Sequence, residues 1–175
     1  MRGDENHLVS ADAPVTVPFD GPGLPNQRMT WVQNGELQNL NCSRYWADRQ
    51  GTRPTGFPSG WYMAGGNSTV DEMIRSTERG LLLTWFWYIR GVDPRTILYT
   101  GLTRDGTFLI ENGEISHPVK NFRWNESPIF MLNNIEMMGE PVRISSGESS
   151  GLTNAVVVPP LKVRDFTFTS LSDAI

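Results

Sequence analysis

The chain has 175 residues, of which 38% are hydrophobic and 19% charged, and its formal net charge is −4. This length and composition are sufficient for one domain with a hydrophobic core. The acidic balance argues against nucleic acid as the main partner, because affinity for a phosphate backbone comes mostly from Lys and Arg.

Three features predict where the protein is located. The single Cys42 excludes an internal disulfide, which fits a reducing compartment. The N-terminal stretch MRGDENHLVS lacks the apolar core of a signal peptide. The longest apolar run, Leu81–Ile89, is about half as long as a membrane-spanning helix. We therefore expect a soluble, cytoplasmic protein without a membrane partner.

The first predicted elements are an extended segment and a hairpin. Residues 1–27 are rich in proline and glycine and show little periodicity, so they predict an extended segment that packs on another part of the protein. We place a single domain at residues 28–175. It begins with TWVQNGELQNL, in which Asn34-Gly35 supplies the two positive φ values of a type I′ hairpin turn.

Two helices are predicted next, each from its capping residues. The first lies between Ser43, a suitable N-cap, and Gly51, a stop signal. The second lies in NSTVDEMIRSTERG, where Ser68 and Asp71 have the spacing of a capping box and Gly80 has the place of a C-terminal glycine. Between the two helices, the sequence predicts a loop around a short strand.

The strand Leu81–Arg90 follows the second helix directly. Alternation places Trp85 and Trp87 on one face and Phe86 and Tyr88 on the other, so both faces are apolar. This pattern favours a buried central strand over the alternative, an aromatic platform that stacks single-stranded nucleic acid.

The rest of the chain predicts a meander, a helix and two closing strands. Turns at Asp105-Gly106 and Asn112-Gly113 separate the three meander strands. Ser127 and Gly139 delimit a helix, and a strand break is expected at Pro159-Pro160. With about eight strands and three helices, we predict an α+β fold that is mainly antiparallel β.

Residues able to carry chemistry are scarce. His7, His117 and Cys42 cannot assemble a common zinc site, so we predict no metal ligand and no catalytic residue. GESSG at Gly147–Gly151 matches the letters of a serine-hydrolase elbow, but it lies in a polar loop and not between a strand and a helix. We interpret both histidines as surface or hydrogen-bonded residues and Cys42 as a small buried residue.

Longer motifs carry a resemblance to a known family. VPFDGPGLP, the QNG hairpin, the helix followed by RG, LIENGEI with PVK, the helix MLNNIEMMG and the closing PPLKV occur in that order. In this order they resemble the C-terminal part of the TldD/PmbA family, metallopeptidase-related proteins once called modulators of DNA gyrase. The resemblance covers about Val15 to Ile175 and implies a mostly antiparallel β region that follows an N-terminal region absent here.

The resemblance also implies a chemistry. Catalytic members are zinc metallopeptidases that act on unfolded or modified peptides, with two ligands from an HExxxH helix and one Cys before the last strands. This chain lacks HExxxH, and the corresponding loop holds Ser145, Ser146, Ser149 and Ser150 instead of Cys. Zinc is therefore expected in a catalytic TldD-like subunit or in the missing region, and this chain in the non-catalytic subunit of a heterodimer or in a fragment.

Two functions remain open at this point. The first is a C-terminal metallopeptidase domain that contributes a peptide groove and a subunit interface. We then expect the groove along ILYTGLTRDGTF, with Tyr99, Thr103 and Arg104 as substrate-binding residues. The second is a non-enzymatic binding or scaffold module, which includes a nucleic-acid binder, although the acidic charge counts against the latter.

Overall fold

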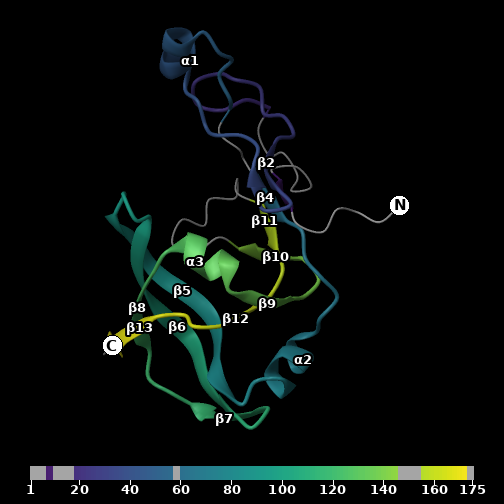
Figure 1. Cartoon of the computed structure of the whole chain (residues 1–175), viewed down its shortest axis with the longest axis vertical. Coiled ribbons are helices and arrows are strands. Elements are labelled where there is room, and N and C mark those ends of the chain that lie inside the picture. The colour runs from purple at the N-terminus through teal and green to yellow at the C-terminus, as the bar shows by residue number, and fades with distance from the viewer. Residues whose placement is uncertain (1–6, 10–17, 57–59, 146–154, 173–175) are drawn as a thin grey trace. The chain divides into compact units, whose positions relative to one another are not determined.

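The computed structural model describes residues 7–9, 18–56, 60–145 and 155–172. These residues form thirteen strands and three helices, and all strand pairs except β4–β11 are antiparallel (Figure 1). The prediction of a mainly antiparallel α+β fold is confirmed, with more strands than expected. None of the described helices has the length and apolar character needed to cross a membrane.

The chain divides into two compact units. The first contains residues 1–66 and 140–160, and the second contains residues 67–139 and 161–175. The chain therefore leaves the first unit, builds most of the second, returns to the first and ends in the second.

The first unit is built on one six-stranded sheet. Its strand order is β10-β11-β4-β1-β2-β3. The strands are β1 (His7–Val9), β2 (Thr30–Gln33), β3 (Glu36–Leu37), β4 (Gly60–Met63), β10 (Val142–Ser145) and β11 (Ala155–Val158). The predicted hairpin joins β2 to β3, and the φ values of Asn34 and Gly35 are 52° and 78°. Trp31 on β2 is buried against Trp61 on β4, with ring centroids 5.9 Å apart.

Helix α1 (Arg44–Gln50) confirms the prediction from its caps. The Ser43 hydroxyl accepts a hydrogen bond from the backbone N–H of Trp46, and Gly51 ends the helix with a φ of 64°. Local sequence determines this helix, because both of its ends are satisfied by residues within one turn.

The second unit is centred on a long hairpin. β5 (Arg79–Asp93) pairs with β6 (Leu98–Glu111), and on its other edge β6 pairs with β7 (Glu114–Pro118) and β8 (Phe122–Glu126). β13 (Phe168–Leu171) adds to β8, so β5 and β13 are the end strands of the order β13-β8-β6-β5 (Figure 1). β9 (Ile135–Met138) and β12 (Leu161–Val163) form a separate two-stranded sheet.

The predicted turn at Asp105-Gly106 is wrong. β6 runs through both residues, and on β5 only Thr84 lies between the partners of Arg104 and Thr107, so the pair forms a β-bulge. Asp105 has a φ of 62°. An Asp-Gly pair favours positive φ, which a bulge can require as well as a hairpin turn does. The predicted turn at Asn112-Gly113 is confirmed, with φ values of 52° and 81°.

The prediction of a buried central strand at Leu81–Arg90 is also wrong. β5 is an end strand of its sheet, and Tyr88 and Ile89 are each 47% exposed. A bulge between Trp87 and Arg90, with a φ of 52° at Tyr88, interrupts the alternation from which burial was inferred. An apolar run therefore does not by itself place a strand inside a sheet.

An aromatic cluster forms the core of the second unit. Trp124 on β8 is 6% exposed, and its ring lies 5.3 Å from Phe86 and 5.6 Å from Phe166, measured between centroids. Phe168 of β13 continues the cluster, 5.1 Å from Phe166. This core joins three strands of the sheet, β5, β8 and β13, through their side chains.

Two helix predictions are corrected at their ends. α2 (Val70–Arg75) is capped by Thr69 and Glu72 in place of Ser68 and Asp71, and Gly80 lies in β5. The sequence offers both capping boxes, one residue apart, and the longer Glu side chain reaches back to the N-cap backbone where Asp is short.

α3 (Pro128–Asn133) is shorter than predicted, and the remainder of that segment forms β9. Ser127 precedes α3 without a side-chain cap hydrogen bond, and Gly139 follows β9. Pairing with β12, distant in sequence, outweighs a helical pattern that already contains the weak helix formers Asn133 and Asn134. The break at Pro159-Pro160 is confirmed between β11 and β12, whereas the third closing strand, β13, was not predicted.

Replacing Thr69 by alanine is expected to destabilise the second unit by about 1 kcal/mol, since Thr to Ala at an N-cap removes one donor partner of the helix. The Thr69 backbone N–H and then its hydroxyl lower the pKa of Glu72. A lowered folded-state pKa means that the cap is complete above the ordinary glutamate range and is lost as the pH falls through the lowered pKa. Urea unfolding at neutral and acidic pH tests this, because the difference between wild type and Thr69→Ala should shrink in acid.

Candidate functional site

The candidate site is an open cavity of about 320 Å³ beside β6. Arg104–Phe108 of β6 form one side of it, and Pro118, Val119 and Asn121 form the other. This volume lies at the small end of the range for small-molecule sites, about 300–1,000 Å³. All of these residues belong to the second unit.

The cavity lies in a gap in the strand pairing along β6. β8 pairs with Tyr99–Leu102, and β7 pairs with Phe108–Glu111, so residues 103–107 face neither strand. The backbone N–H of Val119 donates to the Thr107 carbonyl at 2.9 Å, and the hydrogen-bonded pairing between β6 and β7 ends there. The segment from Val119 to Asn121 then crosses the gap before β8 begins.

A network of three polar side chains spans the gap. The hydroxyls of Thr103 and Thr107 are 2.9 Å apart, and they lie 3.3 and 3.0 Å from the Oδ1 atom of Asn121. The backbone N–H of Phe122 donates to the Thr103 hydroxyl at 2.9 Å. Thr103 is 0% exposed and Thr107 is 4% exposed, so the network replaces the missing strand pairing in a place that water does not reach.

Arg104 presents the cationic group of the site. Its guanidinium carbon lies 5.4 Å from the centre of the Trp87 ring, and Trp87 in turn contacts Trp85 edge to face at 5.4 Å. Arg104 forms no ion pair with a residue that the structure describes. The geometry is that of a cation–π pair between β5 and β6, and the charge pairs with no carboxylate in the described part of the chain.

The three predicted substrate-binding residues are not brought together. Arg104 lines the cavity, whereas Tyr99 lies opposite Gly91 and Glu126, at the other end of β6, and is 36% exposed. Strand alternation places Tyr99 and Thr103 on one face of β6 and Arg104 on the other. Thr103 is fully buried in its hydrogen-bond network.

Sequence reasoning missed Asn121 and the platform formed by Trp87. No spacing in the sequence relates Asn121 to Thr103, because their proximity depends on where β7 ends and β8 begins. One local signal was present, since an Asp-Gly pair inside a predicted strand region can form a bulge as well as a turn, and bulges are frequent beside functional sites.

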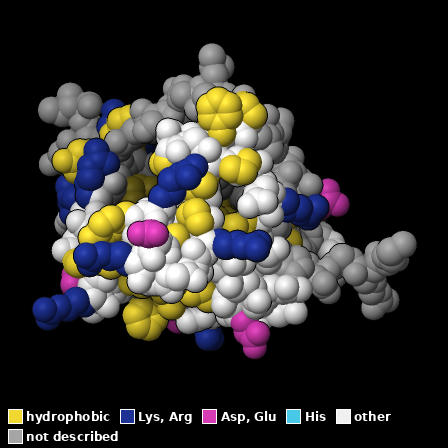
Figure 2. Space-filling model, turned by 90° about the horizontal axis from the view of Figure 1, so that it is seen from above, with side chains coloured by type: hydrophobic (Ala, Val, Ile, Leu, Met, Phe, Trp, Pro, Cys, Tyr) yellow, Lys and Arg dark blue, Asp and Glu magenta, His cyan; other side chains and the backbone are white. Residues whose placement is uncertain are grey.

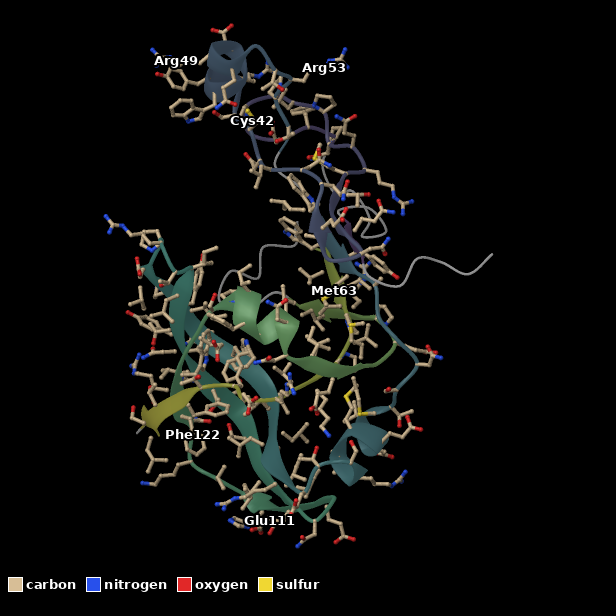
Figure 3. All side chains as sticks on the ribbon, in the orientation of Figure 1. Cys42, Arg49, Arg53, Met63, Glu111 and Phe122 are labelled. Carbon is tan, nitrogen blue, oxygen red and sulfur yellow. The ribbon has the colours of Figure 1, made fainter. Side chains whose placement is uncertain are left out.

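The potential metal ligands do not converge in the described part of the chain. Cys42 lies in the first unit, in the part of the chain around α1 that also carries Arg49 and Arg53 (Figure 3), and His117 lies on β7 in the second. The Nδ1 atom of His117 is 3.0 Å from the Ser116 hydroxyl. Within the described ranges, no three His, Cys, Asp or Glu side chains could hold a metal ion. These donors do not fit a zinc site. Ser146, Ser149 and Ser150, in the loop where the family places a Cys, lie outside the described residues, as does the GESSG match.

β5 provides a second candidate surface. One edge of this 15-residue strand pairs with β6, and no described strand pairs with the other edge. Trp85, Tyr88, Ile89 and Val92 are 38–54% exposed. Figure 2 views the molecule from the top of Figure 1, and on that face too hydrophobic side chains lie among Lys and Arg side chains. A long, unpaired and apolar strand edge is a surface to which extended peptides can add.

Comparison with known proteins identifies relatives over nearly the whole chain. A family model described as the PmbA/TldA metallopeptidase C-terminal domain matches residues 5–170. The metalloprotease PmbA of Escherichia coli O157:H7 is 28% identical over 160 residues, which cover 90% of this chain and 34% of the relative. A zinc metalloprotease TldD homolog of Saccharolobus solfataricus is 26% identical over 185 residues, which cover 93% of this chain and 41% of the relative.

Solved structures share the fold. TldE from Thermococcus kodakarensis has a TM-score of 0.71 at 18% identity, covering 97% of this chain and 40% of that one. A proposed modulator of DNA gyrase from Bacteroides thetaiotaomicron has a TM-score of 0.73 at 24% identity, covering 96% of this chain and 37% of that one. The chain spans between about a third and two fifths of the length of these relatives.

Proposed function

The chain belongs to the family of PmbA/TldA metallopeptidase C-terminal domains, and from this premise we propose that it binds extended peptides for a zinc peptidase assembly. In this proposal the domain is of the non-catalytic subunit type or part of a longer protein. The zinc ligands come from a catalytic TldD-like subunit or from a region that this sequence does not contain. The assembly acts in the cytoplasm on unfolded or modified peptides.

The free edge of β5 is the single observation that carries the proposal. A peptide in extended conformation adds to such an edge through main-chain hydrogen bonds, so recognition depends little on its sequence. The register between Arg79–Leu83 and Thr107–Glu111 is unbroken, whereas bulges interrupt the rest of β5. The peptide is therefore expected to pair with Arg79–Leu83. β6 is excluded as the pairing edge over most of its length, because strands lie on both of its sides.

The role without a metal is supported by the donor set. The described part of the chain brings no group of metal-binding side chains together, and the neutral hydroxyls in the polar loop are poor zinc ligands compared with a thiolate. The proposed partner is supported by exposed apolar side chains near the end of the β5–β6 hairpin, where Val92 and Ile97 are 54% and 43% exposed. Such side chains are suited to a subunit interface.

Hydrogen exchange tests the proposed peptide path. Adding an extended, unstructured peptide to the chain is expected to slow amide exchange in Arg79–Leu83 at least about tenfold, since strand addition protects the free amides of an edge. The end strand β13, at the opposite edge of the same sheet, should not change and is the internal control. Mass spectrometry of peptic fragments measures both regions.

The matched control is a peptide of the same sequence with alternate backbone nitrogens methylated. Methylation along the pairing edge removes the main-chain donors and should abolish the protection, because alternate residues of a strand point their N–H groups to the same side. Protection that survives methylation, or that appears in β13 and not in β5, would refute peptide pairing along β5.

A further inference from the structure

The cavity beside β6 holds a side-chain amide whose orientation is determined by its neighbours. The Oδ1 atom of Asn121 lies 3.3 and 3.0 Å from the hydroxyls of Thr103 and Thr107, which are the donors available to it. The oxygen faces the threonines, because the Thr103 hydroxyl already accepts from the Phe122 backbone N–H and the Thr107 hydroxyl and therefore donates to Asn121. The Nδ2 atom of Asn121 donates to no residue that the structure describes.

Arg104 supplies a second set of donors on the same cavity. Its guanidinium is held over Trp87 at 5.4 Å, which restricts its movement without using its N–H groups. Asp105 also lines the cavity, but it is exposed and forms no ion pair with a described residue. The cavity therefore joins a charged donor and a neutral donor, and neither has an acceptor among the described residues.

Phe108, Pro118 and Val119 give the cavity an apolar part, and Gly106 and Thr107 complete the lining. An anion joined to an apolar group would match both the donors and this apolar part. The backbone beside the cavity has an unusual conformation at Asp105, whose φ is 62°, and Gly106 has no room for a side chain. A Cβ atom on Gly106 would lie 2.4 Å from the Thr84 hydroxyl. A non-glycine residue in the left-handed region is costly and is often found at binding sites.

We propose that this cavity binds the C-terminal carboxylate of a peptide whose last residue is apolar. The Arg104 guanidinium and the Asn121 Nδ2 group donate to the carboxylate oxygens, and the last side chain packs on Phe108, Pro118 and Val119. A carboxylate is favoured over a neutral group, because hydrogen bonds with a charged partner are stronger than those between neutral groups. This inference rests on the proposed function, because both take a peptide as the ligand. The two sites are separate, since no residue of β5 lines the cavity.

Small probes test the cavity without any pairing along β5. The full 175-residue chain, labelled with ¹⁵N, is titrated with N-acetyl-leucine and with N-acetyl-leucinamide, which differ only in the carboxylate. The free acid is expected to bind at least about tenfold more tightly and to shift the side-chain NH₂ resonances of Asn121. Arg104→Gln should remove this preference for the acid. Arg49→Gln is the matched control, because Arg49 lies 5.2 Å from the Tyr45 ring, outside the cavity.

A second variant, Asn121→Asp, keeps the proposal testable if Arg104→Gln does not fold. Asn121→Asp keeps an oxygen that accepts from Thr103 and Thr107 but replaces the NH₂ group by a charged oxygen, so only the acid should bind more weakly. Equal binding of the acid and the amide refutes carboxylate recognition and leaves the β5 experiment unaffected. Inorganic phosphate that binds as well as the acid, at the same resonances, refutes a peptide terminus in favour of a general anion site. Absence of shifts at about 10 mM of either probe also refutes the proposal, since small ligands of this kind reach millimolar affinity.

Discussion

Gly101→Ala is expected to lower the free energy of unfolding of the second unit by about 3 kcal/mol, the upper part of the usual range for overpacking. A Cβ atom at this position would lie 2.4 Å from Cζ2 of Trp124 and 2.6 Å from its Cε2, far inside van der Waals contact. The Trp124 ring cannot move aside at low cost, because Phe86 and Phe166 pack against it. Gly101 is therefore required for close packing of β6 on the aromatic core.

Urea unfolding monitored by tryptophan fluorescence measures the effect of this substitution. Gly91→Ala is the matched control in the adjacent strand, because its Cβ atom would meet Cε1 of Tyr99 at 4.0 Å, an ordinary contact. It should change the free energy of unfolding by less than about 0.5 kcal/mol, as surface substitutions usually do. A loss below about 1 kcal/mol in Gly101→Ala would contradict the packing account, since overpacking costs at least this much.

The elements that sequence predicted correctly are those determined by a few neighbouring residues. The hairpins at Asn34-Gly35 and Asn112-Gly113 depend on two positive φ values each, and α1 depends on Ser43 and Gly51 at its ends. The wrong predictions concern longer distances. β9 was assigned to a helix, because its partner β12 is separated from it by the strands β10 and β11 of the other unit.

The same distinction explains the candidate site. Arg104 was predicted as a substrate-binding residue in the groove expected along ILYTGLTRDGTF, and it lines the cavity. The cavity itself arises because β7 and β8 leave residues 103–107 of β6 unpaired between them. This arrangement depends on the register between separate strands, which the sequence of a single strand does not reveal. Asn121 acquires its role only when the chain crosses that gap.

Thr103→Val is expected to destabilise the second unit by about 2 kcal/mol, the cost of leaving buried polar groups without partners. Valine keeps the volume of threonine, so the effect isolates the hydroxyl. Without it, the backbone N–H of Phe122 loses the acceptor at 2.9 Å, and Thr107 loses a partner at the same distance. Thr169→Val is the control, because Thr169 is exposed on the end strand β13, where its hydroxyl donates to the Arg123 carbonyl of β8.

This substitution also separates two roles for Thr103, which was predicted from sequence to contact substrate. If the hydroxyl only supports the cavity, Thr103→Val lowers stability and loosens the orientation of Asn121, so that both side-chain NH₂ resonances broaden without any ligand. If it contacts a ligand, binding weakens while stability and those resonances stay unchanged. The burial of Thr103, at 0% exposure, favours the first outcome. If Thr103→Val and Thr169→Val change stability equally little, the buried network does not stabilise the segment that crosses the gap between β7 and β8.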